Sequence, residues 1–307
     1  MVLCPEPGVQ FVYKSTIYAI ILDMNTDEGE AWMTGNLQFP SHMVILDRSM
    51  YTHYHEALYA FALEELLCRK IGQGAVPLVH IWRHPRAFVM GLRDSRLPGA
   101  LEARLQLSNE GYSTAVRNSG GAAVPLDLGV VNISLLLPKR EGMMDYRKEF
   151  ELMYALVRES MLSLTAGVEK GEIAGSFCPG EFDLSLGGRK FCGIAQRRQQ
   201  HALSVQAFVI VEGSGGARGE TARRFYERAG AAGEDYPHVI PGTMGSVAEC
   251  LGKAVTVDSF LSGLYGLLRS QGVSEAAGPD ILPDEDEIQE MIKLLKARYE
   301  KDSLDDR

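Results

Sequence analysis

Two consecutive glycines, Gly187 and Gly188, separate two short strand-like segments. These segments span 182–186 and 189–195. A glycine pair in this position supplies the positive φ angles of a two-residue hairpin turn, whose strands are antiparallel. The sequence therefore predicts a β-hairpin and, with it, a sheet that is at least partly antiparallel.

A second glycine pair, Gly120 and Gly121, lies in a loop between two further strand-like segments. Apolar residues alternate at 112–116 and again at 130–137, which indicates a strand on either side of the loop. Apolar residues three and four apart predict amphipathic helices in other parts of the chain. These helices span 54–72, 146–164, 258–269 and 284–299.

The composition is that of an ordinary globular protein. The chain has 307 residues, 46% hydrophobic and 23% charged, which suits one large domain with or without an appendage. Asp and Glu outnumber Lys and Arg by 40 to 31, so there is no basic field for a phosphate backbone and we expect no nucleic-acid partner.

No apolar run near the start approaches the roughly 20 residues that cross a bilayer, so we expect no signal peptide and no membrane partner. Five scattered cysteines favour a reducing compartment, and we expect a cytoplasmic monomer.

Cys178 is the first candidate for a nucleophile, because Pro179 and Gly180 follow it and place the thiol at a turn. A thiol needs a nearby cation or base to act as a thiolate at neutral pH, and Lys190 is the cationic candidate. Lys190 should lie opposite Ser185 in the hairpin, so an unbent chain would put Cys178 roughly 20 Å or more away. The chain must fold back at Pro179 if the two side chains are to meet.

Cys192 is the second candidate, since it lies two residues from Lys190 on the same face of the strand. Geometry alone slightly favours it. A small buried apolar residue is nevertheless the more common role for a cysteine between Phe191 and Gly193. The residues by themselves leave both cysteines open as the nucleophile.

Neither a metal site nor a nucleotide site is indicated. His80 and His84 are four residues apart, but they lie on or just beyond a strand with no third ligand nearby, so we expect a structural or exposed pair and no metal. There is no Gly-x-x-x-x-Gly-Lys-Ser/Thr motif, and neither Gly120-Gly121 nor the glycines at 213–216 open a helix in the dinucleotide-binding pattern. We therefore expect no cofactor.

Two blocks of the sequence carry a resemblance to a known family. Residues 117–134 read RNSGGAAVPLDLGVVNIS, which is similar to the signature loop of the lipoate and octanoate protein ligase and transferase superfamily, a group that also includes the biotin protein ligases. Residues 182–198 read FDLSLGGRKFCGIAQRR, which resembles the lysine-bearing hairpin of the same superfamily. The resemblance spans residues 45–270.

The resemblance implies an α+β fold, in which a mixed, mostly antiparallel sheet is packed with helices in one biotin/lipoate protein ligase-like catalytic domain. We expect that domain to span 43–270, and a linker and a C-terminal helix to fill 271–307. Residues 1–42 mix Pro, Gly and acidic residues with no sustained period. We expect a poorly ordered N-terminal extension there.

The resemblance also favours one branch of the superfamily. The ATP-dependent ligases usually carry a double Arg, and a His before the Asp of the first block, whereas this chain has Val116 before Arg117 and Leu126 before Asp127. That departure argues against a lipoate ligase. A cysteine that precedes the lysine resembles the Gram-positive-type octanoyltransferases, in which Cys178 matches the acyl-accepting position.

The reaction implied by the resemblance is an amidotransfer that needs no ATP. An octanoyl group leaves a lysine of the glycine cleavage H protein, resides on Cys178 as a thioester, and passes to the lysine of a lipoyl domain in a 2-oxoacid dehydrogenase complex. Lys190 is implied as the second catalytic residue, which lowers the pKa of the thiol and stabilises the oxyanion. The implied substrate-binding residues are Arg117, Ser119, Gly120, Gly121 and Asp127.

Several alternatives stay open at this point. Arg117 at a strand end is equally consistent with a solvated surface position, and Asp127 and Asn132 with bracing of the loop through backbone hydrogen bonds. A sister transferase that takes octanoate from acyl carrier protein and loads glycine cleavage H protein shares the order of cysteine and lysine. A non-catalytic module that binds lipoyl domains is an alternative of another class.

Overall fold

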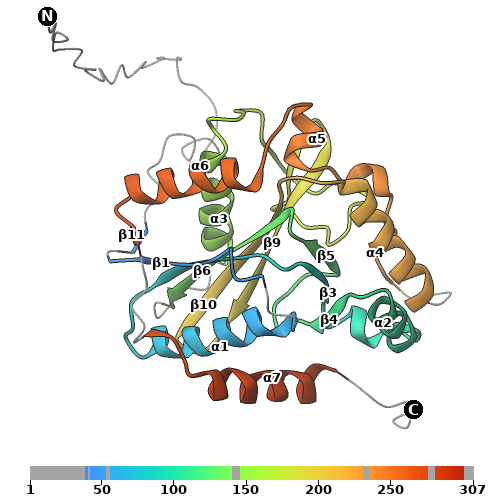
Figure 1. Cartoon of the computed structure of the whole chain (residues 1–307), viewed down its shortest axis with the longest axis horizontal. Helices are drawn as coiled ribbons and strands as arrows, with labels where there is room; N and C mark the ends of the chain where they lie inside the picture. Colours follow the sequence, from blue (N-terminus) through green and yellow to red (C-terminus); the bar gives the residue numbers. More distant parts are fainter. Residues whose placement is uncertain are drawn as a thin grey trace, which may run out of the picture. The chain divides into compact units, whose positions relative to one another are not determined.

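The chain folds around an eight-stranded sheet (Figure 1). The computed structural model describes residues 39–40, 42–52, 56–139, 146–230, 235–275 and 281–300. In spatial order the strands of the sheet are β11 (Ser274–Glu275), β1 (Val44–Arg48), β2 (Leu78–Trp82), β6 (Val130–Pro138), β10 (Ala202–Ile210), β9 (Arg189–Arg198), β8 (Leu184–Leu186) and β7 (Glu169–Lys170). Strand β1 pairs in parallel with β2 and β11, and the remaining neighbours are antiparallel. The expected mixed, mostly antiparallel sheet is confirmed.

A second, three-stranded sheet carries the glycine-rich loop. Its strands are β4 (Ser113–Val116), β3 (Arg86–Met90) and β5 (Val124–Asp127), with β3 in the centre. Strand β3 is parallel to β4 and antiparallel to β5. The segment 117–123, with Gly120 and Gly121, therefore connects the two edge strands of this small sheet. The sequence analysis did not anticipate β5, because its residues were included in the loop.

Helices cover both faces of the large sheet (Figure 1). Helices α3 and α6 pack on one face, where Met153 and Phe260 are fully buried. Helix α1 packs on the other face and is itself covered by α7, while α2 and α4 lie beside the small sheet. The helices are α1 (Leu58–Gly72), α2 (Ala100–Asn109), α3 (Arg147–Ser160), α4 (Gly215–Ala229), α5 (Val247–Leu251), α6 (Val257–Ser270) and α7 (Glu285–Tyr299), with 3-10 turns at Asp94–Arg96 and Pro241–Thr243.

The hairpin between β8 and β9 forms as predicted. Gly187 and Gly188 have φ angles of 55° and 75°, the positive values that a tight two-residue turn requires. Ser185 lies opposite Lys190, and a bulge follows between Leu184 and Ser185. The register places the Lys190 side chain, which is fully buried, over the loop that precedes β8.

The four predicted helices are all present as α1, α3, α6 and α7. Helix α3 ends at Ser160 rather than near residue 164, because the chain tightens into a turn in which Leu164 N–H donates to Met161 O. The prediction for residues 1–42 lies outside the described residues, apart from 39, 40 and 42. No helix in the described ranges is long and apolar enough to cross a membrane.

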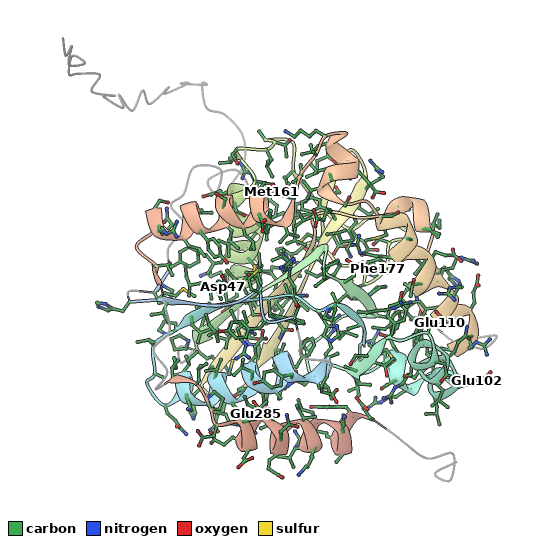
Figure 2. The ribbon with its side chains drawn as sticks, viewed as in Figure 1. Asp47, Glu102, Glu110, Met161, Phe177 and Glu285 are labelled. Atoms are coloured by element: carbon green, nitrogen blue, oxygen red, sulfur yellow. The ribbon has the colours of Figure 1, made fainter. Side chains whose placement is uncertain are left out.

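Helix α7 packs into the core. Strand β11, from the expected linker, extends the large sheet beside β1. Ile288 and Leu295 of α7 are buried against α1. Polar contacts add to this packing. Glu285, at the start of α7 (Figure 2), accepts a 2.9 Å hydrogen bond from Tyr59 Oη of α1, and Lys296 pairs at 2.7 Å with Glu56, which precedes α1.

Candidate active site

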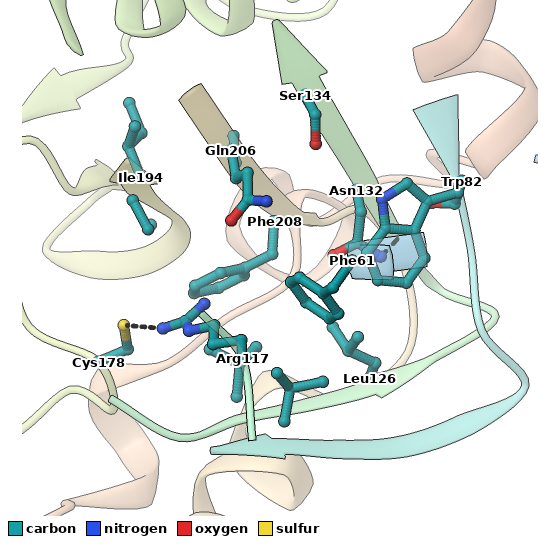
Figure 3. Close-up of a pocket in the computed structure, with 15 residues that line it drawn as sticks. Phe61, Trp82, Arg117, Leu126, Asn132, Ser134, Cys178, Ile194, Gln206 and Phe208 are labelled. Carbon is teal, nitrogen blue, oxygen red and sulfur yellow. Dashed lines mark hydrogen bonds between the residues drawn. The ribbon is translucent and has the colours of Figure 1, made fainter. Parts of the chain in front are cut away.

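The thiol of Cys178 lies beside Arg117, which follows β4, and beside Ala122 of the glycine-rich loop. Its Sγ accepts a hydrogen bond from Arg117 Nη2 at 3.3 Å (Figure 3) and another from the Ala122 backbone N–H at 3.2 Å. Cys178 is 6% exposed and has a φ angle of 49°. A positive φ is uncommon for a residue with a side chain and occurs mainly where the surroundings enforce it.

The glycine-rich loop explains how Ala122 approaches the sulfur. Gly121 has a φ angle of 89°, and a Cβ atom built there would lie 2.8 Å from Cys178 Sγ and 2.5 Å from Arg117 Nη2. Only a residue without a side chain fits this position. Gly120 faces open space by comparison, since the nearest atom to a Cβ there is Gln196 O at 3.9 Å.

The Lys190 side chain contacts backbone atoms of the loop that holds Cys178. Its Nζ donates to the carbonyl oxygens of Cys178 at 2.5 Å and Phe177 at 2.9 Å, and it pairs with Asp183 Oδ2 at 2.8 Å. These three oxygens account for the three donors of an ammonium group. The expected folding back of the chain therefore occurs. Within the described residues the cation that contacts the sulfur is Arg117, not Lys190.

Asp183 fixes the other end of the same turn. Its Oδ2 accepts a 3.0 Å hydrogen bond from Gly180 N–H and forms the ion pair with Lys190. Burial raises the pKa of this carboxyl to about 6, although the Lys190 ammonium opposes the rise. The buried Asp183–Lys190 pair thus holds the backbone on both sides of Pro179. The sequence analysis did not single out Asp183.

A second buried pair, Tyr226 and Asp94, supports the glycine-rich loop. Tyr226 Oη accepts a 3.0 Å hydrogen bond from Ala123 N–H and donates to Asp94 Oδ1 at 2.9 Å. Asp94 in turn accepts from Gly91 N–H at 2.7 Å. Burial raises the pKa values of both Tyr226 and Asp94. Neither residue was found from the sequence, since they are 132 positions apart and belong to no local pattern.

Cys192 lies in a different environment. It is fully buried in the core between the large sheet and helices α3 and α6, and burial raises the pKa of its thiol. It is not among the residues that line the pocket beside Cys178. The position fits the small buried apolar role that was one of its two interpretations.

An apolar pocket begins at Cys178 and passes between the two sheets (Figure 3). Its empty volume, which includes open solvent at its mouth, is about 430 Å³. Phe208 and Phe61 flank its middle, and Trp82 lies on the side away from Cys178. The lining residues are Phe61, Trp82, Val89, Arg117, Val124, Leu126, Asn132, Ser134, Cys178, Gly193, Ile194, Ala195, Gln206, Ala207 and Phe208.

The remaining expected substrate-binding residues divide into two groups. Arg117 lines the pocket, and it is 6% exposed rather than solvated. Ser119 is also buried, and its Oγ has no hydrogen-bond partner among the described residues. Asp127 lies elsewhere, because its carboxylate pairs with Arg218 at 2.5 Å and accepts from Gly129 N–H at 2.8 Å. These are the contacts of a loop brace.

His80 and His84 are buried and make hydrogen bonds within the protein. His80 Nδ1 lies 2.8 Å from Glu64 Oε1, and His84 Nδ1 accepts a 3.0 Å hydrogen bond from Arg86 N–H. No group of three or more His, Cys, Asp or Glu side chains within the described ranges could hold a metal ion.

Comparison with known proteins gives a consistent set of relatives. The family model for the lipoyl protein ligase A/B catalytic domain matches residues 56–265. The chain is 43% identical over 233 residues to a Geobacillus kaustophilus protein, covering 74% of this chain and 82% of the relative. It is 40% identical over 266 residues to a Bacillus velezensis protein, covering 84% and 92%. Both relatives are named octanoyl-[GcvH]:protein N-octanoyltransferase.

Solved structures show the same fold. A lipoate-protein ligase A bound with ATP superposes with a TM-score of 0.60 at 19% identity, over 85% of this chain and 96% of that one. A bi-partite lipoate protein ligase from Thermoplasma acidophilum superposes with a TM-score of 0.57 at 19% identity, over 85% and 93%. At such identities the likeness concerns the arrangement of helices and strands alone.

Proposed function

This chain belongs to the lipoyl protein ligase A/B catalytic domain family, and from that premise we propose that it is a cytoplasmic, monomeric N-octanoyltransferase. Its donor is octanoyl glycine cleavage H protein, the substrate in the names of the relatives that are 36–43% identical to it. Its acceptors are the lysines of lipoyl domains in 2-oxoacid dehydrogenase complexes. The octanoyl group resides on Cys178 between donor and acceptor.

The proposal rests on one observation: the Cys178 thiol, which accepts hydrogen bonds from two donors, lies at one end of an apolar pocket. The pocket beside Cys178 has an empty volume of about 430 Å³ and is lined in its middle by Phe61, Leu126 and Phe208. A straight saturated acyl chain gains about 0.8 kcal/mol for each methylene that it buries in such surroundings. The thiol and the pocket together suit a covalently held fatty acyl group.

In the first step the Cys178 sulfur attacks the carbonyl carbon of the octanoyl-lysine amide. A C–S bond forms and the C–N bond breaks, and the departing lysine nitrogen takes the proton that the thiol gave up. Arg117 Nη2 and Ala122 N–H both point at the sulfur, so they lie close to a carbonyl oxygen two bonds away. Donors placed where negative charge develops are typical of acyl-transfer sites.

In the second step the amine of the acceptor lysine attacks the thioester carbon. A C–N bond forms and the C–S bond breaks, and the proton lost by the amine returns to the sulfur. One octanoyl-lysine amide is consumed and another is made, so the two-step exchange is nearly thermoneutral and requires no ATP. Cys178 is the nucleophile of the first step and the leaving group of the second.

Lys190 acts in this proposal by holding the nucleophile in place. Its three hydrogen bonds go to Asp183 and to the carbonyl oxygens of Phe177 and Cys178. They oppose relaxation of the backbone from the positive φ angle of Cys178, which is 49°. This role differs from the one that the resemblance implied, in which the Lys190 charge acts on the thiol directly.

The test is the intact mass of the purified chain after incubation with octanoyl glycine cleavage H protein. We expect a gain of one octanoyl group that is lost in Cys178→Ala and retained in Cys192→Ala. Addition of a lipoyl domain should then discharge the enzyme and octanoylate the domain. A gain seen only with octanoyl-acyl carrier protein would assign the sister reaction instead, and a gain lost only in Cys192→Ala would overturn the choice of nucleophile.

A further inference from the structure

Two exposed arginines, Arg93 and Arg96, lie in the segment that follows β3. They belong to one 3-10 turn: Arg93 immediately precedes Asp94–Arg96, and Arg96 N–H donates to Arg93 O at 3.1 Å. A 3-10 helix has three residues per turn, so side chains three positions apart lie on the same side of it. The two guanidinium groups therefore share one solvent-facing side of this turn.

Asp94 fixes the turn from the inside. It is 3% exposed, and its carboxylate accepts hydrogen bonds from Gly91 N–H at 2.7 Å and from Tyr226 Oη at 2.9 Å. Ser95 N–H donates to Gly91 O at 3.2 Å, which ties the turn to the end of β3. The inward Asp94 thus holds the backbone that presents the two arginines at the surface.

The turn adjoins the nucleophile through the glycine-rich loop. A Cβ atom built on Gly91 would overlap Gly121 O, and one built on Gly121 would lie 2.8 Å from Cys178 Sγ. The backbone of Gly91 is therefore in contact with the backbone of Gly121, which is in contact with the thiol. Gly121 is itself exposed, so Arg93, two residues beyond Gly91, lies on the surface next to Cys178.

These two arginines have no acidic partner within the described ranges. Neither forms an ion pair with a described Asp or Glu side chain, whereas Arg223, Arg224 and Arg228 of α4 each pair with a glutamate. Like charges three residues apart on one side of a helical turn repel each other. The pair therefore does not stabilise the turn, and both guanidinium groups are available to bind carboxylates.

The charge of the whole chain gives this small cationic surface a directional effect. The net charge is -9, so an acidic protein is repelled by most of the surface and attracted beside Cys178. A lysine ammonium that arrived alone would be repelled by Arg117 at the thiol. Carboxylates near that lysine on the same partner domain would offset this repulsion at Arg93 and Arg96.

We propose that Arg93 and Arg96 form a docking site for acidic side chains on the protein domain that carries the acylated lysine. The inference rests on the proposed octanoyl transfer through Cys178, and it adds the surface chemistry by which the partner is recognised. The arginines act on encounter and affinity in this proposal, because neither is among the groups that contact the sulfur.

The experiment measures binding apart from transfer. The Kd of octanoyl glycine cleavage H protein is measured at low salt on the Cys178→Ala chain, and the octanoylation rate is measured on the chain that retains Cys178. Arg93→Gln and Arg96→Gln should each raise the Kd about threefold, and together about tenfold, the size expected for exposed ion pairs. Added salt should weaken binding by the unaltered surface more than by the double variant. The octanoylation rate at saturating donor should stay nearly unchanged.

Arg69→Gln is the matched control, because it removes the same charge from an exposed position in the last turn of α1. We expect it to leave the Kd nearly unchanged, whereas Arg93→Glu combined with Arg96→Glu should raise the Kd more than the neutral double variant does. An unchanged Kd in both double variants, or an equal loss in Arg69→Gln, would overturn the docking site. A chain that binds the donor but never gains an octanoyl group on Cys178 would instead refute the proposed function.

Discussion

Gly121 offers the sharpest test of how the site is built, because a single methyl group there meets both the nucleophile and its cation. The Cβ atom of Gly121→Ala would lie 2.8 Å from Cys178 Sγ and 2.5 Å from Arg117 Nη2. Ordinary contact is about 3.5 Å, so the sulfur must move by about 0.7 Å and the guanidinium by about 1 Å. A misplacement of about 1 Å can cost about 100-fold in rate.

Gly121→Ala should therefore reduce the rate of Cys178 octanoylation about 100-fold, which corresponds to about 2.7 kcal/mol of activation free energy. The positive φ angle adds a stability cost of about 1–2 kcal/mol, too small to unfold a typical domain. The assay is the time course of the octanoyl mass gain, with circular dichroism to confirm that the variant is folded.

Gly120→Ala is the matched control. Its Cβ would find its nearest neighbour at 3.9 Å, in ordinary contact, and its φ angle is not in the left-handed region. We expect this variant to retain nearly full activity. Equal losses in the two variants, or near-normal activity in Gly121→Ala, would refute the reasoning that the close approach of Gly121 to Cys178 is essential.

Three further predictions concern the buried groups around the loop. Lys190→Met should lower the free energy of unfolding by about 3–5 kcal/mol in chemical denaturation, because it leaves the Asp183 carboxylate buried without its partner. The double variant with Asp183→Asn should recover most of this loss, and the absence of any recovery would contradict the pairing. The raised pKa of Asp183, about 6, means that the ion pair is lost as the pH falls through 6, so octanoylation should decline there and Asp183→Asn should remove that inflection from the pH–rate profile. Tyr226→Phe removes the acceptor of Ala123 N–H and should cost about 1–3 kcal/mol in unfolding free energy together with slower octanoylation, whereas an unchanged rate would show that the loop holds its shape without Tyr226.

Local sequence patterns were enough to predict the hairpin and several helices of the fold. The glycine pair at 187 and 188 specifies a turn whose φ angles only glycine adopts easily, and the register that placed Ser185 opposite Lys190 follows from it. Helices α3 and α6 were likewise visible from apolar spacing. The small sheet was harder to predict, because α2 and β4 lie between β3 and β5 in the chain, so the pairing of these two strands depends on tertiary contacts.

The candidate site could be predicted only in part. Cys178, Arg117 and Gly121 stand in short motifs, and the structure brings them together. The direction of a lysine side chain is not encoded by its neighbours in sequence, so the contacts of Lys190 with carbonyl oxygens could not be foreseen. Tyr226 comes from a helix far along the chain, where nothing local distinguishes it from an ordinary core residue.

The pairing of β1 with β11 has a consequence for synthesis on the ribosome. Val44 lies opposite Ser274, so 230 residues must follow before that edge of β1 finds its partner. Helix α1 is buried on nearly all sides only once α7 has covered it, which requires translation to reach about residue 295. A nascent chain therefore carries an open strand edge and an apolar helix face until β11 and α7 have been made, and non-local contacts of this kind slow folding. Ribosome-bound chains released before α7 should be held by chaperones or aggregate.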